Sequence, residues 1–145
     1  MNLHQLLAAR RDAGRPVRVG LIGAGKFGSM FLAQVPTTPG VAVAAIADLA
    51  PDRARAACRE VGWSDERIAA TRFVEDGSAL AGCCDVEVVV EATGHPAAGI
   101  AHARAAIAGG KHIVMVNVEA PARCSPRRRG ARAWSIRSPT ATSRR

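Results

Sequence analysis

The sequence contains no run of about 18 consecutive apolar residues, the length that a helix needs to cross a bilayer. Its opening stretch, MNLHQLLAARRDAGRP, also lacks the apolar core and small-residue cleavage site of a secretory signal peptide. These two absences argue against a membrane span and a secretory leader. We therefore expect a cytoplasmic protein with no membrane partner.

The four cysteines include no CxxC pair. They are Cys58, Cys83, Cys84 and Cys124, and two adjacent cysteines make a poor framework for structural disulfides. We expect reduced thiols, as is usual in the cytoplasm. His102 and His112 show no ligand spacing with a cysteine or carboxylate, so no metal site is predicted.

Acidic residues are absent from residues 121–145, which hold eight arginines, whereas residues 1–120 hold twelve basic and twelve acidic residues. The formal net charge of +8 is therefore a property of this basic tail. Three hypotheses stay open for it. It is translated out of frame, it is a solvated disordered end, or it is a nucleic-acid-binding arm with Trp134 as its single aromatic residue. The frame change ranks first. One choice of codons for residues 133–144, when it is read in a shifted frame, encodes a segment with strand-like character.

Short aliphatic runs alternate with amphipathic stretches along residues 16–120, with glycine or proline at most junctions. This pattern is typical of βαβ units, and it predicts a Rossmann-type α/β fold: a doubly wound, mostly parallel sheet with helices on both faces. A further helix is predicted within residues 1–15. Strands are predicted at residues 17–23, 41–48, 71–76, 86–94 and 111–117, and helices at 26–35, 51–62, 77–84 and 95–110.

The hexapeptide GAGKFG, residues 23–28, is a GxGxxG motif between a predicted strand and a predicted helix. Gly23 permits a sharp turn, Gly25 leaves room for a pyrophosphate, and Gly28 lets helix and strand approach closely. The start of the helix offers free N–H groups to the phosphates. The overlapping GLIGAGK also satisfies the GxxxxGK phosphate loop, but Phe27 stands where a hydroxyl would be needed to hold magnesium. The motif therefore favours a dinucleotide over a hydrolysed nucleotide.

Asp48 ends the second predicted strand, twenty residues after Gly28. A carboxylate there can accept hydrogen bonds from the adenosine ribose hydroxyls and would repel the 2′-phosphate of NADP. NAD is therefore favoured. Arg53 and Arg55 follow closely and could weaken that discrimination, so NADP stays open.

The segment EATGHP, residues 91–96, ends another predicted strand at the carboxyl edge, where ligands of open α/β sheets bind. Thr93 and Gly94 are expected to line the nicotinamide half of the cleft. His95 is a tempting proton-transfer residue, but its place before Pro96 favours a capping or solvent-facing role. The predicted cofactor-binding residues are thus Gly23, Ala24, Gly25, Lys26, Phe27, Gly28, Asp48, Thr93 and Gly94.

Three segments, VRVGLIGAGKFGSMF, GVAVAAIADL and VVVEATGHPAAGIAHARAAIAGGKHIVMVNVEA, resemble the N-terminal domain of homoserine dehydrogenase-like oxidoreductases. The closer resemblance is to the branch with a SAF-type domain, which includes a deoxyxylulose phosphate reductoisomerase-like enzyme. Homoserine dehydrogenases proper are expected to carry an Asn-Lys pair after the fifth strand. Here Asn117 is followed by valine, which favours the SAF branch.

This resemblance implies an NAD(P)-dependent hydride transfer involving a small polar carbonyl or hydroxy compound. It also implies a second domain that supplies the catalytic residues, so we expect residues 16–120 to be the cofactor domain of a truncated enzyme with unassigned catalytic residues. Exposed sheet edges favour self-association into a homo-oligomer. The alternative function is a non-catalytic dinucleotide-binding or redox-sensing module that uses the basic tail on nucleic acid.

Overall fold

The computed structural model describes residues 2–117. The basic tail, with Cys124 and Trp134, lies outside the described residues. The three hypotheses about the tail therefore stay predictions. Among residues 2–117, no helix is both long enough and apolar enough to cross a membrane. The elements are α1 (Leu3–Asp12), β1 (Val17–Ile22), α2 (Lys26–Gln34), the 3-10 helix η1 (Val35–Thr37), β2 (Val41–Ala47), α3 (Pro51–Glu60), α4 (Asp65–Ala70), β3 (Arg72–Val74), α5 (Gly77–Ala81), β4 (Val88–Glu91), α6 (Pro96–Ala108) and β5 (His112–Met115).

The five strands form one sheet in the order β3-β2-β1-β4-β5, and every neighbouring pair is parallel. This is the strand order of a Rossmann-type sheet, so the predicted fold class is confirmed. The direction of strand succession reverses between β1 and β4, which places their carboxyl ends at the crevice where such folds bind ligands. The pairing of β1 with β2 slips by one residue between Val19 and Gly20.

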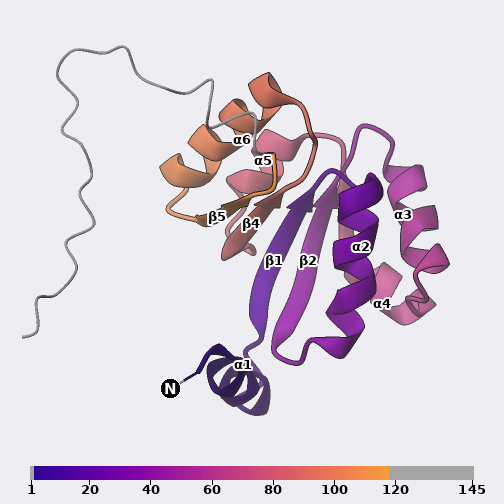
Figure 1. Ribbon diagram of the computed structural model, residues 1–145, viewed down its shortest axis with the longest axis vertical. Helices are drawn as coiled ribbons and strands as arrows, with labels where there is room; N and C mark the ends of the chain where they lie inside the picture. Colours follow the sequence, from indigo (N-terminus) through magenta and orange to yellow (C-terminus); the bar gives the residue numbers. More distant parts are fainter. Residues whose placement is uncertain (1, 118–145) are drawn as a thin grey trace, which may run out of the picture.

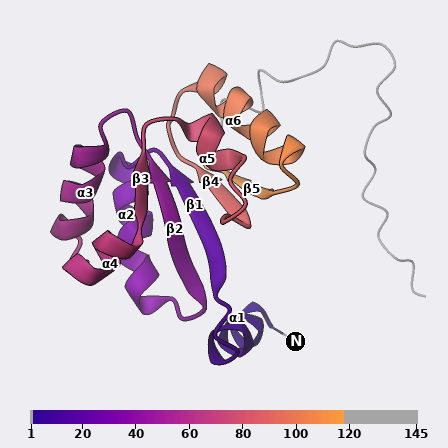
Figure 2. The same cartoon turned by 180° about the vertical axis from the view of Figure 1, so that it is seen from behind.

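Helices cover both faces of the sheet (Figure 1, Figure 2). On one face α2, α3 and α4 bury Leu32, Cys58 and Ile68 against β1 and β2. On the other face α5 and α6 bury Leu80 and Ala106 against the same sheet. Strands buried on both faces need apolar side chains at nearly every position, which explains the continuous aliphatic runs of the sequence.

Two details differ from the sequence-based expectation. Helix α4 was not predicted, although Ser64 caps it by accepting a hydrogen bond from the N–H of Arg67 at 3.3 Å. The helical spacing of Phe27, Met30, Phe31 and Val35 in the sequence predicted one apolar face for α2. However, Phe27 and Met30 are exposed, and the buried positions of α2 are Gly28 and Leu32. Helix α2 lies so close to the glycine loop that only a glycine, Gly28, fits where the helix contacts Gly23.

Candidate cofactor site at the carboxyl edge of the sheet

The glycine loop makes a tight connection between β1 and α2. Gly23 has a positive φ of 93°, and a Cβ there would lie 2.9 Å from the backbone of Ala92 and Thr93. A Cβ on Gly28 would overlap the carbonyl oxygen of Gly23. Both positions therefore require glycine, the first for its conformation and for the loop after β4, the second for helix packing.

Gly25 differs from these two glycines because nothing lies within 4 Å of the Cβ that a larger residue would carry there. It is exposed, has an ordinary φ of −72°, and caps α2. The first N–H groups of a helix have no partner within the helix and give that end a partial positive charge. The open space at Gly25 thus faces a helix N-terminus suited to an anion.

Asp48 joins the end of β2 to the glycine loop. Its Oδ2 accepts a hydrogen bond from the N–H of Ala24, and its Oδ1 accepts hydrogen bonds from the N–H of Ala50 and from Arg53, all at 2.9 Å. Burial alone would raise the pKa of this carboxyl, but the hydrogen bonds of Ala50 and Ala24 and the guanidinium of Arg53 hold it below its usual value. Asp48 is therefore a buried, ionised acceptor at the edge of the crevice.

The two arginines beyond Asp48 have different surroundings. Arg53 pairs with Asp48 and is two-thirds exposed beside the crevice. Arg55 instead pairs with Asp52 at 2.7 Å and stacks over the ring of Phe73, 4.8 Å from its centroid. Arg53 is thus the arginine that lies where it could influence cofactor choice.

Glu91, at the end of β4, is completely buried and anchors the loop that follows. Its Oε1 accepts hydrogen bonds from the N–H and the hydroxyl of Thr93, and it lies 3.4 Å from Nδ1 of His102 in α6. Burial raises the pKa of Glu91, but His102 and Thr93 together keep it below its usual range. The Thr93 hydroxyl donates to Glu91 and accepts from the N–H of His95 at 3.3 Å, so one of its two lone pairs is left for another donor.

A cavity of about 440 Å³ opens at this edge of the sheet. It brings together Gly23, Gly25, Asp48 and Thr93, four of the nine residues that the sequence predicted for the cofactor. Ala24, Lys26, Phe27, Gly28 and Gly94 do not line it. Of these, Lys26 and Phe27 are exposed on the first turn of α2, Gly94 is exposed with a positive φ of 69°, and Ala24 and Gly28 are buried behind the loop.

Among the lining residues that sequence reasoning missed are Glu75, Gly77 and His102. The first two follow β3, whose three-residue length gives little periodic signal. His102 lies on α6, and it faces the crevice only because that helix packs against β4. His95, in contrast, has the expected capping role, because its Nδ1 accepts a hydrogen bond from the N–H of Ala98 at 3.3 Å.

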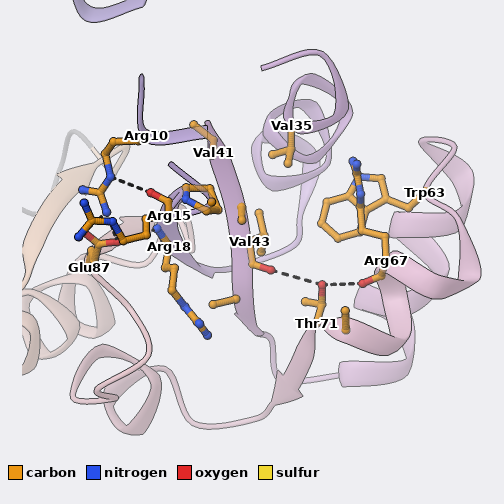
Figure 3. A pocket seen from close by; sticks show the side chains of 15 residues that line it. Arg10, Arg15, Arg18, Val35, Val41, Val43, Trp63, Arg67, Thr71 and Glu87 are labelled. Atoms are coloured by element: carbon orange, nitrogen blue, oxygen red, sulfur yellow. Dashed lines mark hydrogen bonds and ion pairs between the residues drawn. The ribbon is translucent and has the colours of Figure 1, made fainter. Parts of the chain in front are cut away.

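A second cavity, of about 600 Å³, opens at the opposite, amino edge of the sheet (Figure 3). Its apolar walls include Val43 and Trp63, and arginines gather around it. Arg10 pairs with Glu87 at 2.9 Å, and Arg67 lies over the ring of Trp63. The glycine loop lies at the other end of β1, so this cavity is separate from the candidate cofactor site.

A family model described as an oxidoreductase family with an NAD-binding Rossmann fold matches residues 17–123. The chain belongs to this GFO/IDH/MocA family. The resemblance to homoserine dehydrogenase-like proteins and their SAF branch was therefore wrong. The resemblance rested on the glycine loop, the end of β2 and the segment from β4 onward, and these belong to the general architecture of dinucleotide-binding folds, which several families share.

Solved structures of other oxidoreductases have the same fold as this GFO/IDH/MocA domain. One is myo-inositol dehydrogenase from Lactobacillus casei in complex with NAD(H) and myo-inositol, at 24% identity and a TM-score of 0.58, over 69% of this chain and 28% of that one. Scyllo-inositol dehydrogenase from the same organism, with bound NAD(H) and scyllo-inositol, shows 18% identity and a TM-score of 0.57, over 70% and 28%. No curated protein matches the sequence.

A third similar structure is a variant of the 3-ketoreductase KijD10 from Actinomadura kijaniata, in complex with TDP-benzene and NADP. It shows 27% identity and a TM-score of 0.55, over 70% of this chain and 30% of that one. The present chain thus spans less than a third of the length of each of these three proteins.

Proposed function

We propose that residues 16–120 form the cofactor-binding domain of an NAD(P)-dependent oxidoreductase that acts on a small polyhydroxylated carbonyl or hydroxy compound. The observation that carries this proposal is the crevice between β1 and β4, where the open position of Gly25, the start of α2 and the carboxylate of Asp48 meet. Membership of an oxidoreductase family with an NAD-binding fold supports it.

The glycine loop is proposed to hold the cofactor's pyrophosphate. The missing side chain at Gly25 leaves the space for it, and the N–H groups of Lys26 and Phe27 at the start of α2 donate hydrogen bonds to it. Gly23, Ala24 and Gly28 shape the loop without occupying that space. The ammonium group of Lys26 adds a further positive charge on the exposed first turn.

Asp48 is proposed to receive the adenosine ribose and to favour NAD over NADP. Its carboxylate is held ionised and in place by its hydrogen bonds, so it presents a fixed negative charge at the end of β2. Glu75 adds a second carboxylate to the same cavity. With one guanidinium from Arg53, these two carboxylates leave a formal charge of −1 on the three groups, which disfavours a 2′-phosphate.

Thr93 and Gly94 are proposed to line the nicotinamide half of the crevice. Glu91 and the N–H of His95 orient the Thr93 hydroxyl, whose remaining lone pair can accept a hydrogen bond from a ligand. A bound nicotinamide would supply the hydride acceptor or donor for the reaction. The residues of this chain then orient the cofactor and shield one side of it from water.

The substrate class is proposed from the similar structures, two of which contain inositols. Turnover requires a substrate held against the nicotinamide. The chain matches 28% of the length of each of these two proteins, so we propose cofactor binding for the described residues and assign them no catalytic residue.

Titration with NADH and with NADPH, followed by the change in nicotinamide fluorescence, tests the cofactor assignment. Saturable binding of NADH, displaced by NAD⁺ and tighter than that of NADPH, is the expected result. A chain that is folded by circular dichroism and binds neither cofactor would overturn the proposal. Tighter binding of NADPH would overturn the proposed role of Asp48 in selectivity while leaving the cofactor assignment intact.

A further inference from the structure

A cluster of two thiols and a carboxylate lies on the side of the domain away from the glycine loop. Cys83, Cys84 and Asp85 connect α5 to β4, and their sulfur and oxygen atoms lie within 4.8 Å of one another. This connection precedes the amino end of β4, whereas the glycine loop follows the carboxyl end of β1. The proposed cofactor function does not use this cluster.

Cys83 is the best supported member of the cluster. Nη2 of Arg72, the first residue of β3, donates a hydrogen bond to its Sγ at 2.7 Å. The backbone N–H of Asp85 and this guanidinium hold the pKa of the Cys83 thiol below its usual value. Arg18 lies close by, since its Nε donates to the carbonyl oxygen of Asp85 at 2.7 Å. Burial and the carboxylate of Asp85 act in the opposite direction on this pKa, but the hydrogen bonds outweigh them, so the partly exposed setting of Cys83 favours a thiolate.

The positions of the charges argue against a metal ion at this cluster. Arg72 contacts Cys83 and also lies 3.8 Å from Oδ2 of Asp85, so its positive charge stands between the groups that a cation would bind. The guanidinium of Arg72 can itself balance the charge of a thiolate at Cys83. Such a pair leaves the sulfur's nucleophilic lone pairs available to an electrophile that reaches the surface.

We propose that Cys83 is a reversible modification site that reacts with low-molecular-weight disulfides. The Cys83 thiolate attacks one sulfur of the disulfide, a new bond forms between Sγ and that sulfur, and the disulfide's own S–S bond breaks. The second half leaves as a thiolate and takes the electron pair of the broken bond. The sulfur of Cys83 is oxidised and the leaving sulfur is reduced, so no other oxidant is needed.

The other two described cysteines, Cys58 and Cys84, are expected to react with disulfides more slowly than Cys83. Cys58 is fully buried in α3, and burial raises the pKa of its thiol to about 11. Cys84 is exposed, but its Sγ lies 3.9 Å from Oδ1 of Asp85, a carboxylate, and no arginine donates to it. A direct disulfide between Cys83 and Cys84 would be strained, because adjacent Cα atoms lie closer together than normal disulfide geometry requires.

The rate of reaction with dithiodipyridine, which releases a coloured thione, tests the proposal in the full chain at neutral pH. All variants carry Cys124→Ser, because Cys124 lies outside the described residues. In this background we expect one fast thiol that Cys83→Ser removes and Cys84→Ser leaves in place. Arg72→Gln should slow this phase about threefold or more, because the thiolate loses its guanidinium partner. Arg72 is half-exposed, so the substitution is expected to leave the fold intact.

Arg59→Gln is the matched control, because Arg59 is an exposed arginine whose ion pair involves Asp65, far from this cluster in the sequence. Mass spectrometry after brief exposure to oxidised glutathione should locate one added glutathione on Cys83, and a reductant should remove it. A fast phase that persists in Cys83→Ser, or an unchanged rate in Arg72→Gln, would overturn the proposal. Since the modified residue lies at the opposite edge from Gly25, NADH binding should be equal before and after modification.

Discussion

Asp48 Oδ2 accepts a hydrogen bond from the N–H of Ala24 at 2.9 Å, and this contact ties the end of β2 to the middle of the glycine loop. The same carboxylate accepts from Ala50 and pairs with Arg53. Asp48 therefore has a structural role in addition to its proposed role toward the ribose. The two roles are separable, because the first affects stability with no cofactor present and the second affects the choice between two cofactors.

Replacing Asp48 with alanine is expected to lower both stability and NAD selectivity. The N–H groups of Ala24 and Ala50 lose their acceptor, which should lower the free energy of unfolding by about 1–3 kcal/mol. The ratio of the NADH to the NADPH dissociation constant should rise about tenfold, since a ribose acceptor and a charge repelling the 2′-phosphate are both lost. Urea unfolding and fluorescence titration measure the two effects.

Asp52→Ala is the control for this substitution, because the Asp52 side chain is almost fully exposed. Within the described residues, its carboxylate interacts with Arg55 alone. Asp52→Ala should change neither the free energy of unfolding nor the ratio of the NADH to the NADPH dissociation constant appreciably. A cofactor ratio in Asp48→Ala equal to that of the unsubstituted chain would contradict the proposed contact with the ribose.

Two glycines of the loop are expected to respond to valine in opposite ways. Gly25→Val should lower the free energy of unfolding by less than about 1 kcal/mol, because its Cβ meets nothing and its backbone is extended, yet it should weaken NADH binding more than about tenfold. Gly28→Val should destabilise the fold by about 3 kcal/mol, because its Cβ overlaps the carbonyl oxygen of Gly23. Unfolding curves with and without NADH distinguish these effects, and full NADH affinity in Gly25→Val would count against the pyrophosphate site.

Glu91 is expected to contribute a stability that disappears in acid. Its pKa is lowered in the folded state, so the contribution is fully present above the unfolded value of about 4.3 and is lost as the pH falls through the folded value. Glu91→Gln should therefore cost about 1–3 kcal/mol at neutral pH and much less near pH 3. Urea unfolding at both pH values, with the exposed Glu75→Gln as control, checks this. A cost independent of pH would indicate a packing effect instead of a charge effect.

Trp63 links α2 to the segment after α3 and is expected to be important for stability. Its Nε1 donates to the carbonyl oxygen of Leu32 at 2.9 Å, and the residue is buried. Trp63→Phe should lower the free energy of unfolding by about 1–3 kcal/mol, because a buried carbonyl loses its donor and the smaller ring leaves space. Chemical denaturation followed by circular dichroism measures this. Leu49→Ala, at a residue that is 92% exposed, should have little effect.

The sequence was sufficient to predict the five strands in order and the fold class, although not helix α4. Continuous aliphatic runs are typical of strands covered on both faces, and such strands alternating with helices leave few alternatives to a parallel sheet. It was also sufficient to predict that Gly25 and Asp48 lie together, because both follow strands whose carboxyl ends share one edge of the sheet. The family was identified wrongly for the same reason, since these features are common to many dinucleotide-binding folds.

Tertiary structure alone decided which side chains complete the site. Glu91 and His102, eleven residues apart in the sequence, meet because α6 packs back onto β4. Cys83 meets Arg72 because the chain returns through α5 to the start of β3. Neither pair shows a periodic signal in the sequence. Local patterns depend on neighbours along the chain, and they determined the strands, helices and glycine loop of this protein. The ionised Glu91 and the Arg72-paired Cys83 arise from packing between distant segments, which only the folded domain brings together.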